Sequence, residues 1–166
     1  NEMVCFVADA VLFGTKNSGA PAWSIDQLYP AAMVSTLAHE FQHMINYYQR
    51  IENAFEPMDT WLDELLSLAT EDLLAAKLGG KGPRGIIASD VTDGGPDQID
   101  GRIPEFNHFP ETSLVNWDYK SAQYSVLYDY ARSYALGAWV IRNWDAPAIL
   151  RAIQHSTAAT TPAMLA

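Results

Sequence analysis

The stretch HEFQH at residues 39–43 decides how this part of the chain folds. Apolar residues recur at helical spacing before and after it, which predicts an α-helix through the whole stretch. Residues four apart lie one turn above each other on the same helix face, so His39 and His43 can direct two imidazoles at one point. A tetrahedral zinc ion needs this geometry from two of its ligands. The stretch therefore predicts a metal site built on a helix.

Glu40 lies one position beyond the first histidine, where its carboxylate can sit beside a bound metal without ligating it. From there it can take a proton from metal-bound water, which is the role of a general base. The alternative is that the two histidines are half-buried residues that only pack the helix. The apolar residues around the motif are expected to form one core stripe: Leu37, Phe41, Met44, Ile45 and Tyr48.

A catalytic zinc site takes three protein ligands and leaves one position for water. One known pattern continues the motif with a glycine and a third histidine, but Asn46 and Gln49 occupy those positions here. The other pattern takes a glutamate from the next helix. Residues 61–74 are predicted to be that helix, capped by Asp59 or Thr60 and ended by a glycine pair.

Three of the four acidic residues on this second helix are candidates for the metal site. Glu64 is the predicted third ligand, and it shares a helix stripe with Ser67 and Glu71. Asp63 is the competitor, although it points about 100° away on the helical wheel. Glu71 is interpreted either as an acceptor that holds a ligand histidine in the correct tautomer or as a solvated charge. Asp72 is expected on the surface.

Two segments together resemble a known family. HEFQHMIN at residues 39–46 and WLDE at residues 61–64 are similar to the H-E-x-Q-H-x-I-N and Trp-Leu-x-Glu segments of the hyicolysin family, bacterial zinc metallopeptidases of the gluzincin clan. Residues 113–117 and 133–138 further resemble a Trp-containing turn and a Tyr-Gly-Ala helix of that family. The resemblance covers most of the chain and is strongest over residues 37–74.

The resemblance implies both a fold and an activity. The fold is an α+β zincin-like metalloprotease domain, mainly helical, with at least one strand near the active-site helix. The activity is that of a zinc-dependent endopeptidase acting on a peptide or protein substrate, with one Zn²⁺ held by His39, His43 and Glu64 and with Glu40 as the catalytic base. A secreted or cell-surface location in a bacterium follows from the same resemblance.

Two other kinds of function stay open. One is a non-catalytic zincin-like surface or adhesin module that binds a partner, although the intact base Glu40 favours the enzyme. The other is a helical interaction domain without metal. Residues 1–166 are expected to form a single domain, as a piece of a longer chain, because no signal peptide is visible and the first residue is Asn1.

The C-terminal third is predicted to be helical. Residues 120–144 are predicted to be one long helix with an aromatic stripe at helical spacing, which is typical of core packing. Zinc peptidases also need a donor for the oxyanion of the tetrahedral intermediate. Tyr134 is the candidate because it lies in the segment that resembles the Tyr-Gly-Ala helix of the family, with Tyr130 as the alternative. Asp145 is predicted to cap a final helix that reaches about Gln154.

The remaining segments are less specific. Residues 3–11 are predicted to be a strand, rich in Val and Phe. Residues 79–110 have the composition of a loop, in which His108 can be a substrate contact or simply a structural residue. The aspartates of this segment suit calcium, but their spacing fits no recognised calcium loop.

Composition excludes some classes of partner. The chain has 166 residues, 49% of them hydrophobic, which is enough for a core of its own. Its formal net charge of −10 argues against nucleic acid and anionic membranes, because both require a positive patch. No apolar run is long enough to span a membrane. The oligomeric state is not indicated.

Overall fold

The computed structural model describes residues 30–52, 57–78, 83, 102–108, 110–111, 113–117, 126–156, 158 and 160. The described residues are mostly helical, with elements α2 (Pro30–Tyr47), η2 (Tyr48–Glu52), α3 (Thr60–Leu78), α4 (Arg102–His108), α5 (Leu127–Asn143) and α6 (Ala146–His155). These ranges contain no strand, and the strand predicted at residues 3–11 lies outside them. The predicted helical content is therefore confirmed, and the architecture fits a zincin-like domain.

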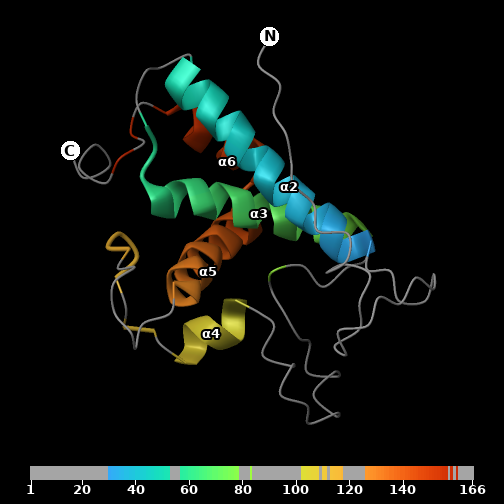
Figure 1. The fold of residues 1–166 in the computed structure, drawn as a ribbon, viewed down its shortest axis with the longest axis vertical. Coiled ribbons are helices and arrows are strands. Elements are labelled where there is room, and N and C mark those ends of the chain that lie inside the picture. Colours follow the sequence, from blue (N-terminus) through green and yellow to red (C-terminus); the bar gives the residue numbers. More distant parts are fainter. Residues whose placement is uncertain are drawn as a thin grey trace, which may run out of the picture.

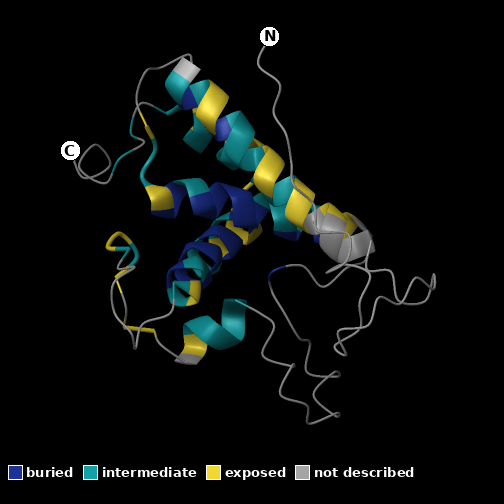
Figure 2. Ribbon diagram, in the orientation of Figure 1, coloured by how far each residue is buried: buried dark blue, intermediate teal, exposed yellow. Residues whose placement is uncertain are grey.

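Helix α3 is the centre of the described fold. Helix α2 packs against one part of its surface and α5 against another, while α4 and α6 lie against α5 (Figure 1). Helix α6 also contacts η2, the π-helical continuation of α2. The buried residues are concentrated on α3 and α5 (Figure 2). The position of α3 thus sets the positions of the helices around it.

The apolar core forms along the contact between α3 and its neighbours. Leucines at several successive turns of α3 are 1–2% exposed. Full burial of one such side chain stabilises the fold by about 1.5–3 kcal/mol. One cluster is built on Trp61, Leu62, Leu65 and Leu66, and a second is built on Leu68, Tyr134 and Ala138.

Gly137 allows α5 to approach α3 closely. A Cβ atom at this position would lie 3.1 Å from both Cγ and the carbonyl oxygen of Leu65. The side chain of Leu65 can adjust, but its carbonyl belongs to the backbone of the central helix. The small residue in the segment 133–138 therefore has a packing role between these two helices.

Helix boundaries follow the capping signals of the sequence. Helix α3 begins at Thr60, and the carbonyl of Asp59 accepts hydrogen bonds from the backbone N–H groups of Leu62 and Asp63. Helix α6 begins after Asp145, whose side chain accepts a hydrogen bond from the N–H of Ala148 at 3.2 Å. The predictions of these two helices are confirmed.

The predicted core stripe of α2 is wrong at three of its five residues, whereas Met44 and Ile45 are half-buried. Leu37, Phe41 and Tyr48 are 36%, 54% and 56% exposed. The face of α2 that packs on α3 is instead polar, and its side chains form hydrogen bonds and ion-pair contacts with α3: His39, Gln42, His43 and Asn46. Apolar periodicity identifies a face that can be buried, but it does not say which face meets the neighbouring helix.

The prediction of a loop over residues 79–110 is also wrong in part, because α4 forms within it. Pro104 lies in the first turn of α4, where its missing N–H has no intrahelical partner to lose. Arg102 donates to Glu105 at 3.1 Å, and Ile103 packs against the cluster that contains Tyr134. The packing of Ile103 ties the short helix to α5.

The end of η2 is fixed to the end of α6. Arg50 is 3% exposed, and its Nη1 donates to the carbonyl oxygen of Ser156. This contact holds the chain just after the HEFQH motif against a segment more than a hundred residues later.

None of the helices in the described ranges has the length and hydropathy of a membrane span.

Candidate metal centre

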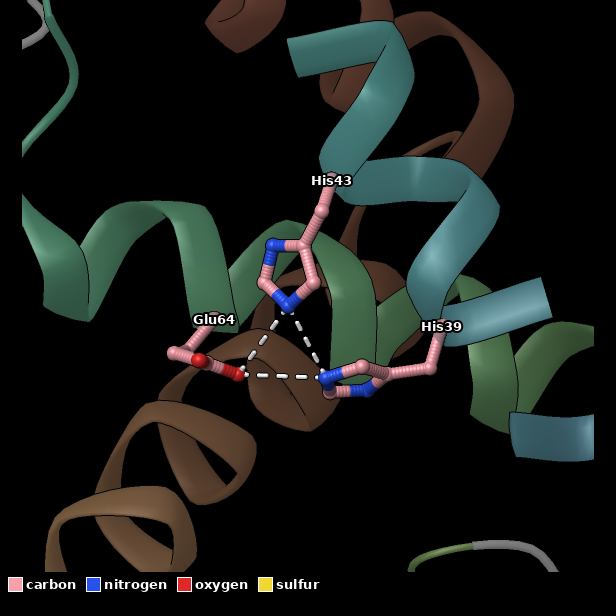
Figure 3. A group of neighbouring side chains, drawn as sticks. All are labelled: His39, His43 and Glu64. Carbon is pink, nitrogen blue, oxygen red and sulfur yellow. Dashed lines mark hydrogen bonds and ion pairs between the residues drawn. The ribbon is translucent and has the colours of Figure 1, made fainter. Parts of the chain in front are cut away.

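Three side chains from two helices converge on one point. His39 and His43 come from adjacent turns of α2, and Glu64 comes from the second turn of α3 (Figure 3). His39 Nε2 lies 3.1 Å from His43 Nε2 and 3.2 Å from Glu64 Oε2. His43 Nε2 lies 3.6 Å from the same oxygen. The three residues form a group that could hold a metal ion.

These separations fit one face of a tetrahedron. With metal–ligand bonds of about 2.0–2.1 Å, the ligand atoms of a tetrahedral zinc site lie about 3.3 Å apart. Glu64 is 7% exposed, and its Oε2 is buried against the Nε2 atoms of both histidines. A buried carboxylate needs a positive partner, which protonated histidine or a bound metal ion can supply. The donor set and the geometry therefore suit a metal ion with a fourth position left over.

The Nδ1 atoms of both histidines contact carboxylates of α3. His39 Nδ1 lies 3.3 Å from Glu71 Oε2, and His43 Nδ1 lies 2.9 Å from Asp63 Oδ2. An acceptor at Nδ1 favours the tautomer in which Nδ1 is protonated and Nε2 carries the lone pair. Both histidines can thus present Nε2 to a metal at the same time.

The charges of the site favour protonated histidines when no metal is bound. Burial lowers the pKa of His39, but the carboxylates of Glu64 and Glu71 outweigh it and raise that pKa to about 9. Burial also lowers the pKa of His43, and the hydrogen bond and charge of Asp63 outweigh it, so the net shift is upward. A divalent metal bound here would take the place of these protons.

Glu40 stands apart from this group. It is exposed on α2, one residue after His39, and does not belong to the three side chains that converge. Its exposure leaves the side chain accessible to solvent. The base role predicted for it needs such access, since the proton comes from water.

Tyr134 has a partner other than the converging group. It is 0% exposed, and its hydroxyl donates to Asp72 Oδ1 at 2.9 Å. Burial, and then the charge of Asp72, raise the pKa of Tyr134, so the hydroxyl stays protonated. Arg142 Nη2 lies 2.8 Å from the other oxygen of Asp72. These contacts favour a structural role, and the oxyanion role stays a prediction.

The surface position expected for Asp72 is wrong. Asp72 is 8% exposed, because α5 covers this side of α3 and supplies both of its partners. Tyr130, the alternative oxyanion donor, packs edge-to-face with Trp117 at 5.3 Å between ring centroids and lies under Arg102. The side chain of His108 and the aspartates of residues 90–100 lie outside the described residues.

Two polar residues that share the helix face of the histidines are not identified from the sequence. Gln42 and Asn46 lie on the same helix stripe as the histidines, and Asn46 is 2% exposed. A signal was available, because residues 39, 42, 43 and 46 repeat at helical spacing and are all polar. The sequence suggests Asp63 only as an alternative ligand, whereas in the structure its Oδ2 contacts Nδ1 of His43.

Comparison with known proteins relates the chain to a metalloprotease. It is 30% identical over 117 residues to the neutral metalloprotease ShpI of Staphylococcus hyicus, a match that covers 67% of this chain. The chain spans only 22% of the length of that protein. No family model matches the chain, and no solved structure matches it. The similarity and the His-His-Glu group both fit a relationship to metalloproteases.

Proposed function

We propose that this chain carries the catalytic site of a zinc-dependent endopeptidase. The observation that supports this most directly is the spacing of 3.1, 3.2 and 3.6 Å among two imidazole nitrogens and one carboxylate oxygen. Two histidines and a glutamate are a common donor set of catalytic zinc. The resemblance to the hyicolysin family and the similarity to ShpI support peptide bonds as the substrate.

The residues of the site have separate roles in this proposal. His39, His43 and Glu64 hold the ion and leave a position open to solvent and substrate. When bound, zinc supplies Lewis acidity toward a carbonyl oxygen and toward water. Glu40 takes a proton from the attacking water and returns it to the nitrogen of the leaving amine. Glu71 accepts the Nδ1 proton of His39 and so keeps its Nε2 available.

The location follows from the resemblance alone. A secreted or cell-surface bacterial enzyme is the expectation that the hyicolysin family provides.

The first test is the zinc content of the purified protein after dialysis against a chelator and reloading. The expected result is one tightly held zinc per chain by elemental analysis, together with cleavage of a peptide library that stops when zinc is removed. Zinc binding without cleavage, and a partner bound equally well by wild type and Glu40→Gln, would instead favour a non-catalytic zincin-like module. No zinc in a folded sample would overturn the proposal.

A further inference from the structure

A continuous chain of hydrogen bonds runs behind His43. Thr70 Oγ1 donates to Gln42 Oε1 at 3.0 Å, and Gln42 Nε2 donates to Asn46 Oδ1 at 2.7 Å. Asn46 Nδ2 then donates to Asp63 Oδ1 at 2.6 Å, and Asp63 Oδ2 lies 2.9 Å from His43 Nδ1. We call these five residues the Asp63 network. Each end of the network is a contact between α3 and α2: Thr70 with Gln42 at one end, and Asp63 with His43 at the other.

The direction of every bond in the Asp63 network follows from the charge of Asp63. An ionised carboxylate can only accept, so Asn46 must present its amide nitrogen to it. The amide oxygen of Asn46 then faces Gln42, which must donate through its own amide nitrogen. The oxygen of Gln42 is left to accept from the hydroxyl of Thr70. A reversed amide at Gln42 would place its oxygen against the oxygen of Asn46. A reversed amide at Asn46 would place its oxygen against the carboxylate of Asp63 and its nitrogen against that of Gln42.

A residue of helix α6 also fixes the orientation of the Asn46 amide. Gln154 Nε2 donates to Asn46 Oδ1 at 3.2 Å, so two donors meet the same oxygen of Asn46. Asn46 is 2% exposed, and a buried amide turned the wrong way would lose these partners. Contacts from α2, α3 and α6 therefore all require the amide nitrogen of Asn46 to face Asp63.

The carboxylate of Asp63 also determines which ring nitrogen of His43 carries the proton. With Asp63 Oδ1 occupied by Asn46, Oδ2 accepts the proton of His43 Nδ1. The hydroxyl of Ser67 lies 3.1 Å from the same nitrogen and can share this proton as a second acceptor. Nε2, on the opposite edge of the ring, is left as the atom that faces His39 and Glu64.

We propose that Asp63 is a positioning residue rather than a metal ligand. It fixes His43 as the Nδ1-protonated tautomer, and the orientation is transmitted from Thr70 and Gln154 through Gln42 and Asn46. Both oxygens of Asp63 are occupied on the far side of the ring from Nε2, which leaves neither for the metal. This inference rests on the proposed zinc site.

The test compares single substitutions with an exchange of the two polar partners. Asp63→Ala removes the acceptor, and loss of such an outer partner lowers metal affinity by about 10–100-fold. Asp63→Asn keeps an oxygen for His43 but turns a donor toward Asn46. The double variant Asp63→Asn with Asn46→Asp restores acceptors for Gln42, Gln154 and His43, so it should recover zinc affinity lost in Asp63→Asn. Glu111→Gln, at an exposed turn outside the network, is the charge control.

Zinc affinity is measured by competition with a chelator, and the protonated ring nitrogen of His43 by long-range ¹H–¹⁵N NMR of the zinc-loaded protein. Wild-type affinity and an unchanged Nδ1–H signal in Asp63→Ala would overturn the inference, as would the absence of recovery in the double variant. A metal ligand missing from the X-ray absorption spectrum of Asp63→Ala would show Asp63 to be a ligand. Absence of zinc from the wild type would instead overturn the proposed function.

Discussion

The hydroxyl of Tyr134 donates a hydrogen bond to Asp72, 2.9 Å away, and joins α5 to α3 across 62 residues of sequence. Tyr134→Phe should therefore lower the free energy of unfolding by about 1–3 kcal/mol, because a buried carboxylate oxygen loses its donor. Turnover should stay within a few-fold of wild type. Chemical denaturation and peptidase assays on the same samples measure both effects.

The same variant decides the role that the sequence suggested for Tyr134. Loss of an oxyanion donor lowers kcat by about 10²–10³-fold with little change in KM. A drop of that size in folded Tyr134→Phe would contradict the structural role. Asp72→Asn is the matched control, since it weakens the same contact from α3 and leaves the tyrosine hydroxyl in place.

Glu64→Ala should weaken zinc binding by more than about 100-fold, beyond the effect of losing an outer partner. The reason is that Glu64 Oε2 is the carboxylate oxygen that lies 3.2 and 3.6 Å from the two Nε2 atoms. Chelator competition measures the affinity, and circular dichroism checks the fold. If Glu64→Ala kept full zinc occupancy while Asp63→Ala lost it, the third ligand would be Asp63.

Glu40→Gln should keep one zinc per chain and lose about 10²–10⁴-fold in kcat, because the amide cannot take a proton from water. Zinc content and kcat are determined on the same preparation. The exposed position of Glu40 predicts little change in the free energy of unfolding. Unchanged turnover would remove Glu40 from the mechanism.

The metal-free protein should lose stability as the pH rises from about 6.5 to about 9. The pKa of His39 is raised from 6.5 to about 9 in the fold, so its protonated form stabilises the folded state. That contribution is complete below pH 6.5 and disappears as the pH passes the folded pKa. Zinc competes with the same protons, so its affinity should rise over this interval.

Urea unfolding of chelator-treated protein at several pH values measures the first effect, and chelator competition measures the second. His39→Gln is the reference, because subtracting its profile removes the titration of other groups. A difference between wild type and His39→Gln that grows in favour of wild type toward high pH would contradict the assignment.

Gly137→Val should destabilise the fold by about 1–3 kcal/mol, since the added side chain meets Leu65 where a Cβ alone would be at 3.1 Å. The melting temperature and the denaturation midpoint measure the loss. Ala152→Val, on an exposed position of α6, controls for the weaker helix propensity of valine. Equal effects of the two substitutions would mean that α5 can move away from α3.

The local features of this chain were readable from its sequence, and the contacts between distant segments were not. Spacing within α2 and α3 was sufficient to select His39, His43 and Glu64, which the structure brings together. The cap at Asp145 was equally local. In contrast, the burial of Asp72 depends on side chains about 60 to 70 residues later, which no periodicity within α3 can reveal.

The error in α2 has a physical cause. Its apolar and polar stripes have the same helical period, and only the neighbour decides which is covered. The polar stripe faces α3 because α3 offers acceptors and donors at matching heights, among them Asp63 and Thr70. Hydrophobicity alone ranks the stripes in the opposite order.

Helix α3 carries both the leucines of the core and the carboxylates of the metal centre. One inserted or deleted residue before Glu64 would turn everything beyond it by about 100° relative to the preceding residues. The acid, the acceptors for both histidines and the leucines would lose their alignment together. The metal centre and the core of this protein therefore share a single register, and an insertion or deletion in the first turns of α3 disturbs both at once.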